Sequence, residues 1–174
     1  MRAVLAQNRG AVQTGSAARE QGVEMSTVER KAQVVWKGNL DSGWGMVNTD
    51  RGTVRDTPID WASRVGEGSG PTPEELIAAA LGSCYSMSLS HWLTDSGHEP
   101  EQLEVVATCI LDKGIQGIKI SHVDLDVTGQ VEGLTDRRFR EIAEMAEEKC
   151  PVARLFVGNA SMHLDTHLQH AAVH

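Results

Sequence analysis

The sequence has no long apolar run and no excess of positive charge. Its longest apolar stretches, such as Leu76 to Leu81, fall far short of the roughly 20 residues needed to span a bilayer. The net charge is −8, with acidic and basic residues interspersed, so no concentrated positive field attracts phosphate backbones or anionic lipid. The sequence therefore predicts a soluble protein that binds neither membranes nor nucleic acid.

Cysteine is scarce, and the N-terminal segment lacks the continuous apolar core of a secretory signal. The chain holds three cysteines, an odd number, which fits a reducing cytosol better than a secreted disulfide scaffold. We therefore expect a cytoplasmic protein in which any disulfide takes part in the chemistry.

The length of 174 residues, 40% of them hydrophobic, suits one compact domain and is too short for two ordinary ones. Residues 1–24 have too little apolar surface to offset the entropy of ordering. We predict a flexible N-terminal extension over residues 1–24, with Met25 able to serve as a second start, and a single domain over residues 25–174.

The first half of this domain shows short strands and then a strong helix start. Apolar residues and turn signals predict strands at 30–36, 46–49 and 53–58, followed by a loop rich in Gly, Ser and Pro at 61–73. Thr72 and Glu75 form a T-x-x-E capping box. The predicted helix runs from there toward Gly97, and its apolar composition favours a central position.

The second half alternates strands with a second helix. Period-2 alternation predicts strands at 103–112 and 118–131, and the phase slip between Ile120 and Val123 indicates a bulge. The remaining expected elements are a helix at 136–149, a helical turn at 152–154 and a closing strand at 160–167. This order predicts an α+β domain, in which a mostly antiparallel sheet packs on a long central helix.

The three cysteines differ in their surroundings. Cys84 lies in the apolar helix among small residues, so its sulfur could be approached, but a free cysteine in such a place is often part of the core. Cys150 stands at a helix end before Pro151, where it could be presented at a surface or cleft. Cys109 occupies an apolar position of a regular strand, which predicts a core residue.

A catalytic thiolate needs a nearby cation, because an unperturbed thiol is mostly protonated at neutral pH. Arg64, in the loop before the apolar helix, could supply that charge and several hydrogen-bond donors. Glu74, at the second position of the helix, is equally explained by the helix dipole. On their own, both residues are also consistent with solvated surface charges.

Two strings resemble a known family. The string GPTPEELIAAALGSCYSMSL, at residues 70–89, is similar to the signature G-T-N-P-E-E-L-[IF]-x-A-A-x-x-A-C-[FY]-x-x-A-L of the OsmC and Ohr family of thiol peroxidases, and KCPVARLF resembles its second motif, C-P-[VY]-S. In the OsmC branch an arginine lies 20 positions before the first cysteine, a glutamate ten before it and a second cysteine 66 after it. These offsets fall on Arg64, Glu74 and Cys150.

The resemblance extends from about Ala32 to Leu164. Two departures stand out: Ser63 and Val65 flank the arginine where relatives often have an R-F-E segment, and Ala153 stands where many members carry serine. Neither change removes a group that the chemistry needs.

The resemblance implies an OsmC-like fold, an intertwined homodimer and a role in oxidative-stress defence. Cys84 would reduce organic hydroperoxides to alcohols and become a sulfenic acid, which Cys150 would convert to a Cys84–Cys150 disulfide. A thiol or dithiol reductant would reset the pair, with no cofactor and no metal. Arg64 would stabilise the thiolate and the leaving oxygen, and Glu74 would hold Arg64 in place.

Two alternatives remain open at this point. One is a non-enzymatic redox sensor or small-ligand-binding protein on the same fold. The other is a metal site made of cysteines with His163, His167 or His170, although no C-x-x-C motif accompanies them. A further constraint is that ten helical residues rise about 15 Å, so Glu74 reaches Cys84 only through Arg64 or from a partner subunit.

Overall fold

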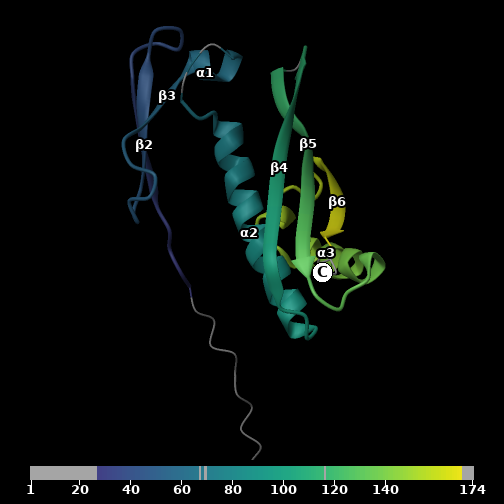
Figure 1. The fold of residues 1–174 in the computed structure, drawn as a ribbon. Helices are drawn as coiled ribbons and strands as arrows, with labels where there is room; N and C mark the ends of the chain where they lie inside the picture. Colours follow the sequence, from purple (N-terminus) through teal and green to yellow (C-terminus); the bar gives the residue numbers. More distant parts are fainter. Residues whose placement is uncertain (1–26, 67, 69, 116, 170–174) are drawn as a thin grey trace, which may run out of the picture. The chain divides into compact units, whose positions relative to one another are not determined.

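The computed structural model describes residues 27–66, 68, 70–115 and 117–169, and the predicted extension at 1–24 lies outside them. The fold is α+β, as predicted, with two three-stranded sheets (Figure 1). In chain order the elements are β1 (Ala32–Lys37), β2 (Trp44–Thr49), β3 (Thr57–Asp60), α1 (Trp61–Val65), α2 (Pro73–Asp95), β4 (Pro100–Gly114), β5 (Gly117–Val131), α3 (Asp136–Lys149), the 3₁₀ turn η1 (Ala153–Leu155) and β6 (Ser161–Gln169).

The first sheet is antiparallel, in the order β1-β2-β3. The third strand begins four residues later than the prediction of 53–58, because Gly52 and Asp56 both adopt a positive φ and keep the chain in turns until Thr57. All six residues of β1 are exposed, including Val34, Val35 and Trp36.

The predicted loop at 61–73 begins instead with a short helix, α1, so that part of the prediction is wrong. Asp60 caps this helix: its carboxylate accepts a hydrogen bond from the Ser63 amide at 2.6 Å. The helix ends at Gly66, which has a left-handed φ of 92°. These two local signals are enough to form one turn and a half of helix within a segment rich in loop-forming residues.

The long helix α2 begins with the predicted capping box between Thr72 and Glu75. One face of α2 is fully buried, through residues that recur every four positions: Leu81, Tyr85, Leu89 and Leu93. The opposite face carries exposed residues such as Ala79 and Met87. Within a single chain, one face of α2 therefore has the central, buried position that the sequence predicts, and the other face does not. No described helix is long and apolar enough to cross a bilayer.

The second sheet has the order β4-β5-β6, with β4 antiparallel and β6 parallel to β5. The predicted bulge is present: Ile110 pairs with His122 and Leu111 with Ile120, which leaves Ser121 as the extra residue. Because β5 and β6 are parallel, α3 serves as the crossover between them.

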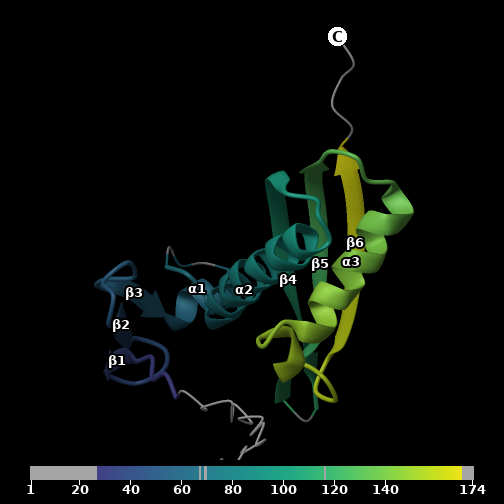
Figure 2. The same ribbon diagram turned by 90° about the horizontal axis from the view of Figure 1, so that it is seen from below.

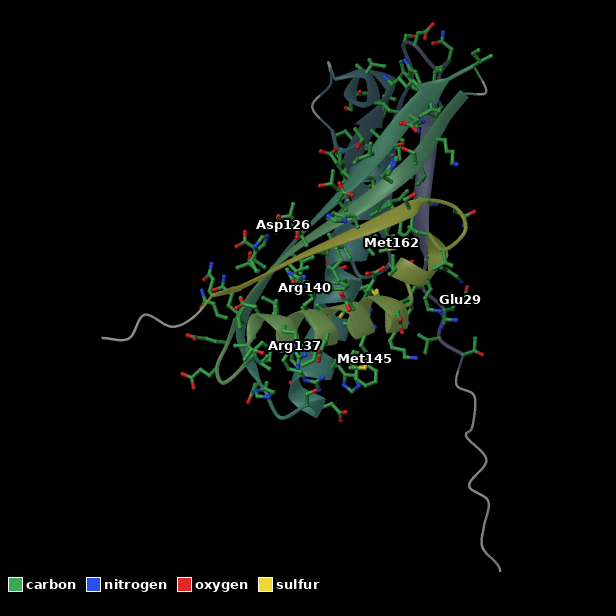
Figure 3. The ribbon with its side chains drawn as sticks, turned by 90° about the vertical axis from the view of Figure 1, so that its right-hand side faces the viewer. Glu29, Asp126, Arg137, Arg140, Met145 and Met162 are labelled. Atoms are coloured by element: carbon green, nitrogen blue, oxygen red, sulfur yellow. The ribbon has the colours of Figure 1, made fainter. Side chains whose placement is uncertain are left out.

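Helices α2 and α3 pack against each other and cover one face of the second sheet (Figure 2). The other face is mostly polar, although Val106 and Ile110 are also exposed on it, and in Figure 3 Asp126 projects from it while Arg137 projects from α3 on the opposite side. The core lies between helices and sheet, where Phe139 of α3 packs over Gly129 of β5. A Cβ at Gly129 would lie 2.5 Å from the Phe139 ring, so only glycine allows this approach.

Candidate functional site

Cys84 lies in the middle of α2, at the edge of the buried stripe. Its side chain is half-buried and packs against the core. Gly82, two residues earlier, is buried where α2 approaches β4, and a Cβ at this position would lie 3.6 Å from the Ala107 methyl group. Ser83, on the other side, is exposed. Cys84 thus follows two small residues in sequence, Gly82, which is buried, and Ser83, which is exposed.

Cys150 directly follows α3 and is its C-cap residue. Its amide donates hydrogen bonds to the carbonyl oxygens of Ala146 at 2.9 Å and Glu147 at 3.2 Å. The sequence suggested that this residue could be presented at a surface or cleft, but its side chain is fully buried. The reason is helical periodicity: Phe139, Ala143, Ala146 and Cys150 follow one another at intervals of three and four, so Cys150 continues the inward stripe of α3.

The fold brings Cys84 and Cys150 together, although 66 positions separate them in sequence. Both are free thiols. Burial raises the pKa of the Cys150 thiol, the neighbouring Cys84 adds to that rise, and the backbone amides of Ala153 and Val152 act against it. The result is a pair of thiols of unequal exposure, one half-buried on a helix and one enclosed in the core.

Arg64 and Glu74 form the second part of the site. The Arg64 guanidinium donates a hydrogen bond to the Glu74 carboxylate at 2.5 Å, in an ion pair that joins α1 to the first turn of α2. Glu74 is only 7% exposed, and the Trp61 ring centroid lies 5.9 Å from the Arg64 guanidinium carbon. Among the described residues, Arg64 Nε and Glu74 Oε2 are buried without a hydrogen-bond partner. One donor and one acceptor of the pair are therefore left for another group.

In a single chain Arg64 pairs with Glu74 and Cys84 with Cys150, and these two pairs do not come together. Glu74 and Cys84 are ten residues apart on the same continuous helix, which corresponds to a rise of about 15 Å. Within the described ranges, neither Arg64 nor Glu74 has a hydrogen bond or ion pair with Cys84. The first of the two routes suggested by the sequence, Arg64 bridging from Glu74 to Cys84, is not seen in the single chain.

Cys109 lies on β4 and packs against the core, as predicted. Burial raises the pKa of its thiol, and the charge of nearby Glu74 adds to the rise. Such an environment favours the neutral thiol over the reactive thiolate.

The sequence prediction did not include the residues that hold Arg64 in place. Asp60 caps α1, and the Ser63 hydroxyl, on the same short helix, accepts a hydrogen bond from the Gly70 amide at 3.1 Å. The available signal was Asp60 itself, a favoured N-cap type, followed by five residues without Gly or Pro.

The metal alternative has little to support it in the described part of the chain. His163 and His167 project from the exposed positions of β6, and His170 lies outside the described residues. No group of three or more His, Cys, Asp or Glu side chains in the described ranges is arranged to hold a metal ion.

Known proteins share both the sequence pattern and the fold. A family model described as OsmC-like protein matches residues 66–165. Peroxiredoxin OsmC of Escherichia coli (strain K12) is 33% identical over 143 residues, which cover 82% of this chain and 99% of the relative. The chain belongs to the OsmC-like family. The match to the OsmC-like model includes Glu74, Cys84 and Cys150 and begins two residues after Arg64.

Solved structures of OsmC and Ohr proteins have the same fold. The organic hydroperoxide resistance protein OhrB of Bacillus subtilis superposes with a TM-score of 0.62 at 26% identity, covering 78% of this chain and 97% of that one. An organic hydroperoxide resistance protein OsmC from Legionella pneumophila gives a TM-score of 0.65 at 20% identity, covering 82% and 99% of the two chains. The names of these OsmC-like relatives point to a peroxidase role in the family.

Proposed function

We propose that this chain is a thiol-dependent peroxidase that reduces organic hydroperoxides to alcohols, with Cys84 as the attacking sulfur and Cys150 as the resolving thiol. The observation that carries the proposal is the contact between these two free thiols, one within α2 and the other directly after α3. A half-buried thiol next to a buried one is the arrangement that a two-cysteine peroxidase requires: the first meets the substrate, and the second meets only the first.

The chemistry has three steps. The Cys84 thiolate attacks the distal oxygen of the hydroperoxide, the O–O bond breaks, and the alkoxide leaves as an alcohol after it takes up a proton. The Cys84 sulfenic acid then reacts with the Cys150 thiol to give a disulfide and water. Two thiol groups of an external reductant, from one dithiol or two monothiols, return both cysteines to the reduced state.

Arg64 and Glu74 complete this site in a homodimer. The Arg64 guanidinium stabilises the thiolate and the developing charge on the leaving oxygen, while Glu74 fixes its orientation. The unpartnered Arg64 Nε supports this role, since it is a buried donor with no acceptor among the described residues. Because the pair lies far from Cys84 of the same chain, we assign the Arg64–Glu74 pair of each site to the partner subunit.

The surface of the single chain supports a second copy as the partner. Val34 and Trp36 of β1 are 57% and 40% exposed, an unusual exposure for large apolar side chains of a strand. A groove of about 640 Å³ runs between the exposed face of α2 and the edge strand β4, and Ala79, Ser83 and Val105 line it. An intertwined homodimer would cover both surfaces.

Three free cysteines in the chain also favour a cytoplasmic location.

The experiment that tests the proposed function is a stopped-flow reaction of the reduced protein with cumene hydroperoxide and, separately, with hydrogen peroxide. We expect a fast reaction of the wild type with the organic peroxide, no reaction of Cys84→Ser, and an accumulating sulfenic acid in Cys150→Ser. Cys109→Ser is the matched control and keeps the wild-type rate of the peroxide reaction.

The same experiment separates the peroxidase from a redox sensor or ligand-binding protein on this fold. A wild-type protein that reacts no faster than a free thiol contradicts the peroxidase proposal. A fast reaction that survives in Cys84→Ser assigns the attack to another residue.

A further inference from the structure

Two hydroxyl groups of α2, those of Tyr85 and Ser88, reach across to the backbone of α3. The Tyr85 hydroxyl donates to the carbonyl oxygen of Ala143 at 3.1 Å, and the Ser88 hydroxyl donates to that of Ala146 at 3.0 Å. Donors and acceptors are each three residues apart, so the two hydrogen bonds are about one turn apart on both helices. Two such bonds fix both the sliding and the rotation of one helix against the other.

The Ser88 bond is unusual among the serines of this helix. Serine hydroxyls within a helix commonly donate to a carbonyl of their own helix, as Ser86 does to Gly82 at 2.7 Å and Ser83 to Ala80 at 3.1 Å. Ser88 instead donates to α3. The Tyr85 hydroxyl belongs to a fully buried side chain, and burial raises its pKa, which keeps it a protonated donor.

Both bonds act on the segment that carries Cys150. The Ala146 carbonyl oxygen accepts the Cys150 amide at 2.9 Å as well as the Ser88 hydroxyl, so one atom links α2 to the backbone of Cys150. Tyr85 directly follows Cys84 in sequence. The two hydrogen bonds therefore connect the helix of the first thiol with the helix end that holds the second.

We propose that Tyr85 and Ser88 are positioning residues for the resolving step, because their hydroxyls hold the end of α3 where the Cys150 sulfur can attack the oxidised Cys84. This inference rests on the proposed function. In that step the Cys150 sulfur forms the S–S bond, the S–O bond of the Cys84 sulfenic acid breaks, and hydroxide leaves with the Cys150 proton as water. A disulfide forms only when the two Cα atoms lie within a narrow range, about 4.4–6.8 Å, so a small shift of α3 slows it.

The first step makes no such demand, because the peroxide diffuses to Cys84 and does not need α3 in a fixed position. Loss of either hydroxyl therefore separates the two steps of the reaction. Removal of the Ser88 hydroxyl also leaves the Ala146 oxygen bonded to the Cys150 amide.

The test is a rapid-quench reaction of the reduced protein with cumene hydroperoxide, with the Cys84 sulfenic acid trapped by dimedone and the disulfide counted by mass spectrometry. We expect Tyr85→Phe and Ser88→Ala each to form the sulfenic acid at the wild-type rate and the disulfide about threefold to tenfold more slowly, as expected for the loss of one hydrogen bond. Ser88→Thr keeps a hydroxyl and restores the rate. Ser86→Ala, whose hydroxyl bonds within α2, is the matched control and resolves like the wild type.

Wild-type resolution in both Tyr85→Phe and Ser88→Ala overturns the inference, and so does an equal slowing of both steps, which indicates a general structural loss. A wild-type protein that forms no sulfenic acid at Cys84 contradicts the proposed function instead, and one that forms the acid but no disulfide contradicts the resolving role of Cys150. The three failures are therefore distinguishable.

Discussion

At the scale of single residues, the two thiols of the site differ mainly in their access to water. Cys84 is half-buried, whereas Cys150 is enclosed by the core and lies next to the fully buried Tyr85. Burial raises the pKa of both Cys150 and Tyr85, because a thiolate or phenolate there loses its hydration. Both groups therefore favour the protonated state in the folded protein.

The first prediction concerns the stability of the reduced protein at alkaline pH. The pKa values of Cys150 and Tyr85 are higher in the folded protein than in the unfolded chain. Their contribution to the free energy of unfolding is therefore complete below the pKa values of the unfolded chain and is lost as pH rises. We expect the free energy of unfolding to fall above about pH 8.5, where an unfolded thiol loses its proton, by up to about 1.4 kcal/mol per pH unit for each group. Urea denaturation from pH 7 to 11 measures this slope.

Tyr85→Phe and Cys150→Ala provide the comparison. Tyr85→Phe should flatten the decline above about pH 10, and Cys150→Ala should flatten the part that begins near about pH 8.5. A decline that is identical in the wild type and both variants assigns the alkaline instability to other groups.

Residue-scale reasoning from the sequence succeeded for Cys109 and left the exposure of Cys150 undecided. Cys109 sits in a regular alternating strand, so its inward direction follows from the period of the pattern. Cys150 lies just past a helix end, where Pro151 signals a turn. The turn does occur, but the inward stripe of α3 extends one residue beyond the helix, and the sequence around Pro151 does not show this.

At the scale of elements, α3 carries acidic residues along its last turns. Glu144, Glu147 and Glu148 lie near the C-terminal end, where a negative charge opposes the helix dipole. Burial raises the pKa of the Glu147 carboxyl, and the neighbouring Glu144 and Glu148 add to the rise. Glu141, one turn earlier, instead pairs with Arg137 and Arg138. The same helix thus holds an unfavourable group of carboxylates at its C-terminal end and, one turn earlier, a carboxylate in favourable ion pairs.

The second prediction is that Glu147→Gln stabilises the protein at pH 7. The gain should be about 0.3–1 kcal/mol, limited by solvent screening because the side chain is only half-buried. The pKa of Glu147 is raised in the folded protein, so its charge does not destabilise the wild type below about pH 4.3. The difference in the free energy of unfolding between Glu147→Gln and the wild type should therefore grow as pH rises from 4 to 7.

The control for this prediction is Glu141→Gln, which removes two exposed ion pairs and should be neutral or slightly destabilising at pH 7. Thermal unfolding of both variants at pH 4 and pH 7 gives the four values required. A stabilising effect of Glu147→Gln that is the same at both pH values contradicts the electrostatic explanation.

Elements with long periodic patterns were predictable from the sequence, and so were the short elements β1, β2 and η1, but α1 and the position of β3 were not. The helix at 136–149 has the predicted bounds, and the phase slip in the second long strand is a bulge at Ser121. The helix α1 and the position of β3 were missed, because each depends on a single N-cap or positive φ and has no period to detect. The parallel pairing of β6 with β5 could not be predicted either, because the alternation of apolar and polar residues along a strand does not show its direction.

At the scale of the whole molecule, the pairing of Cys84 with Cys150 and of Arg64 with Glu74 divides the proposed site between the middle and the first turn of α2. The spacing of the four residues could be obtained from the sequence only through the family resemblance. Their separation into two pairs in the single chain could not, because it depends on how α1, α2 and α3 pack, and a period along one chain carries no information on such contacts.

The third prediction follows from this division. In a homodimer whose sites each combine Cys84 of one chain with Arg64 of the other, the Cys84→Ser homodimer does not react with peroxide and the Arg64→Ala homodimer reacts slowly. Loss of the arginine should cost about 100-fold to 1,000-fold in rate, as for other groups that stabilise developing negative charge. Mixed dimers, refolded together, contain one complete site and should recover part of the wild-type activity.

Separation of the mixed dimers by affinity tags, with their mass checked by light scattering, provides the measurement. A mixture of Cys84→Ser with Cys84→Ala, which has no complete site in any combination, is the control. If verified mixed dimers recover no peroxidase activity, Arg64 belongs to the site of its own chain. A monomeric wild-type protein contradicts the homodimer itself.

The order of the two thiols along the chain has a consequence during synthesis. The segment with Cys84 is made 66 residues before the one with Cys150, so a ribosome working at about 5–20 residues per second takes roughly 3–13 s to make the residues between them. Until α3 is complete, a nascent chain has no Cys150 to convert a Cys84 sulfenic acid, the intermediate of the proposed reaction, to a disulfide. The proposed reaction can therefore run to the disulfide only in chains whose synthesis has passed α3.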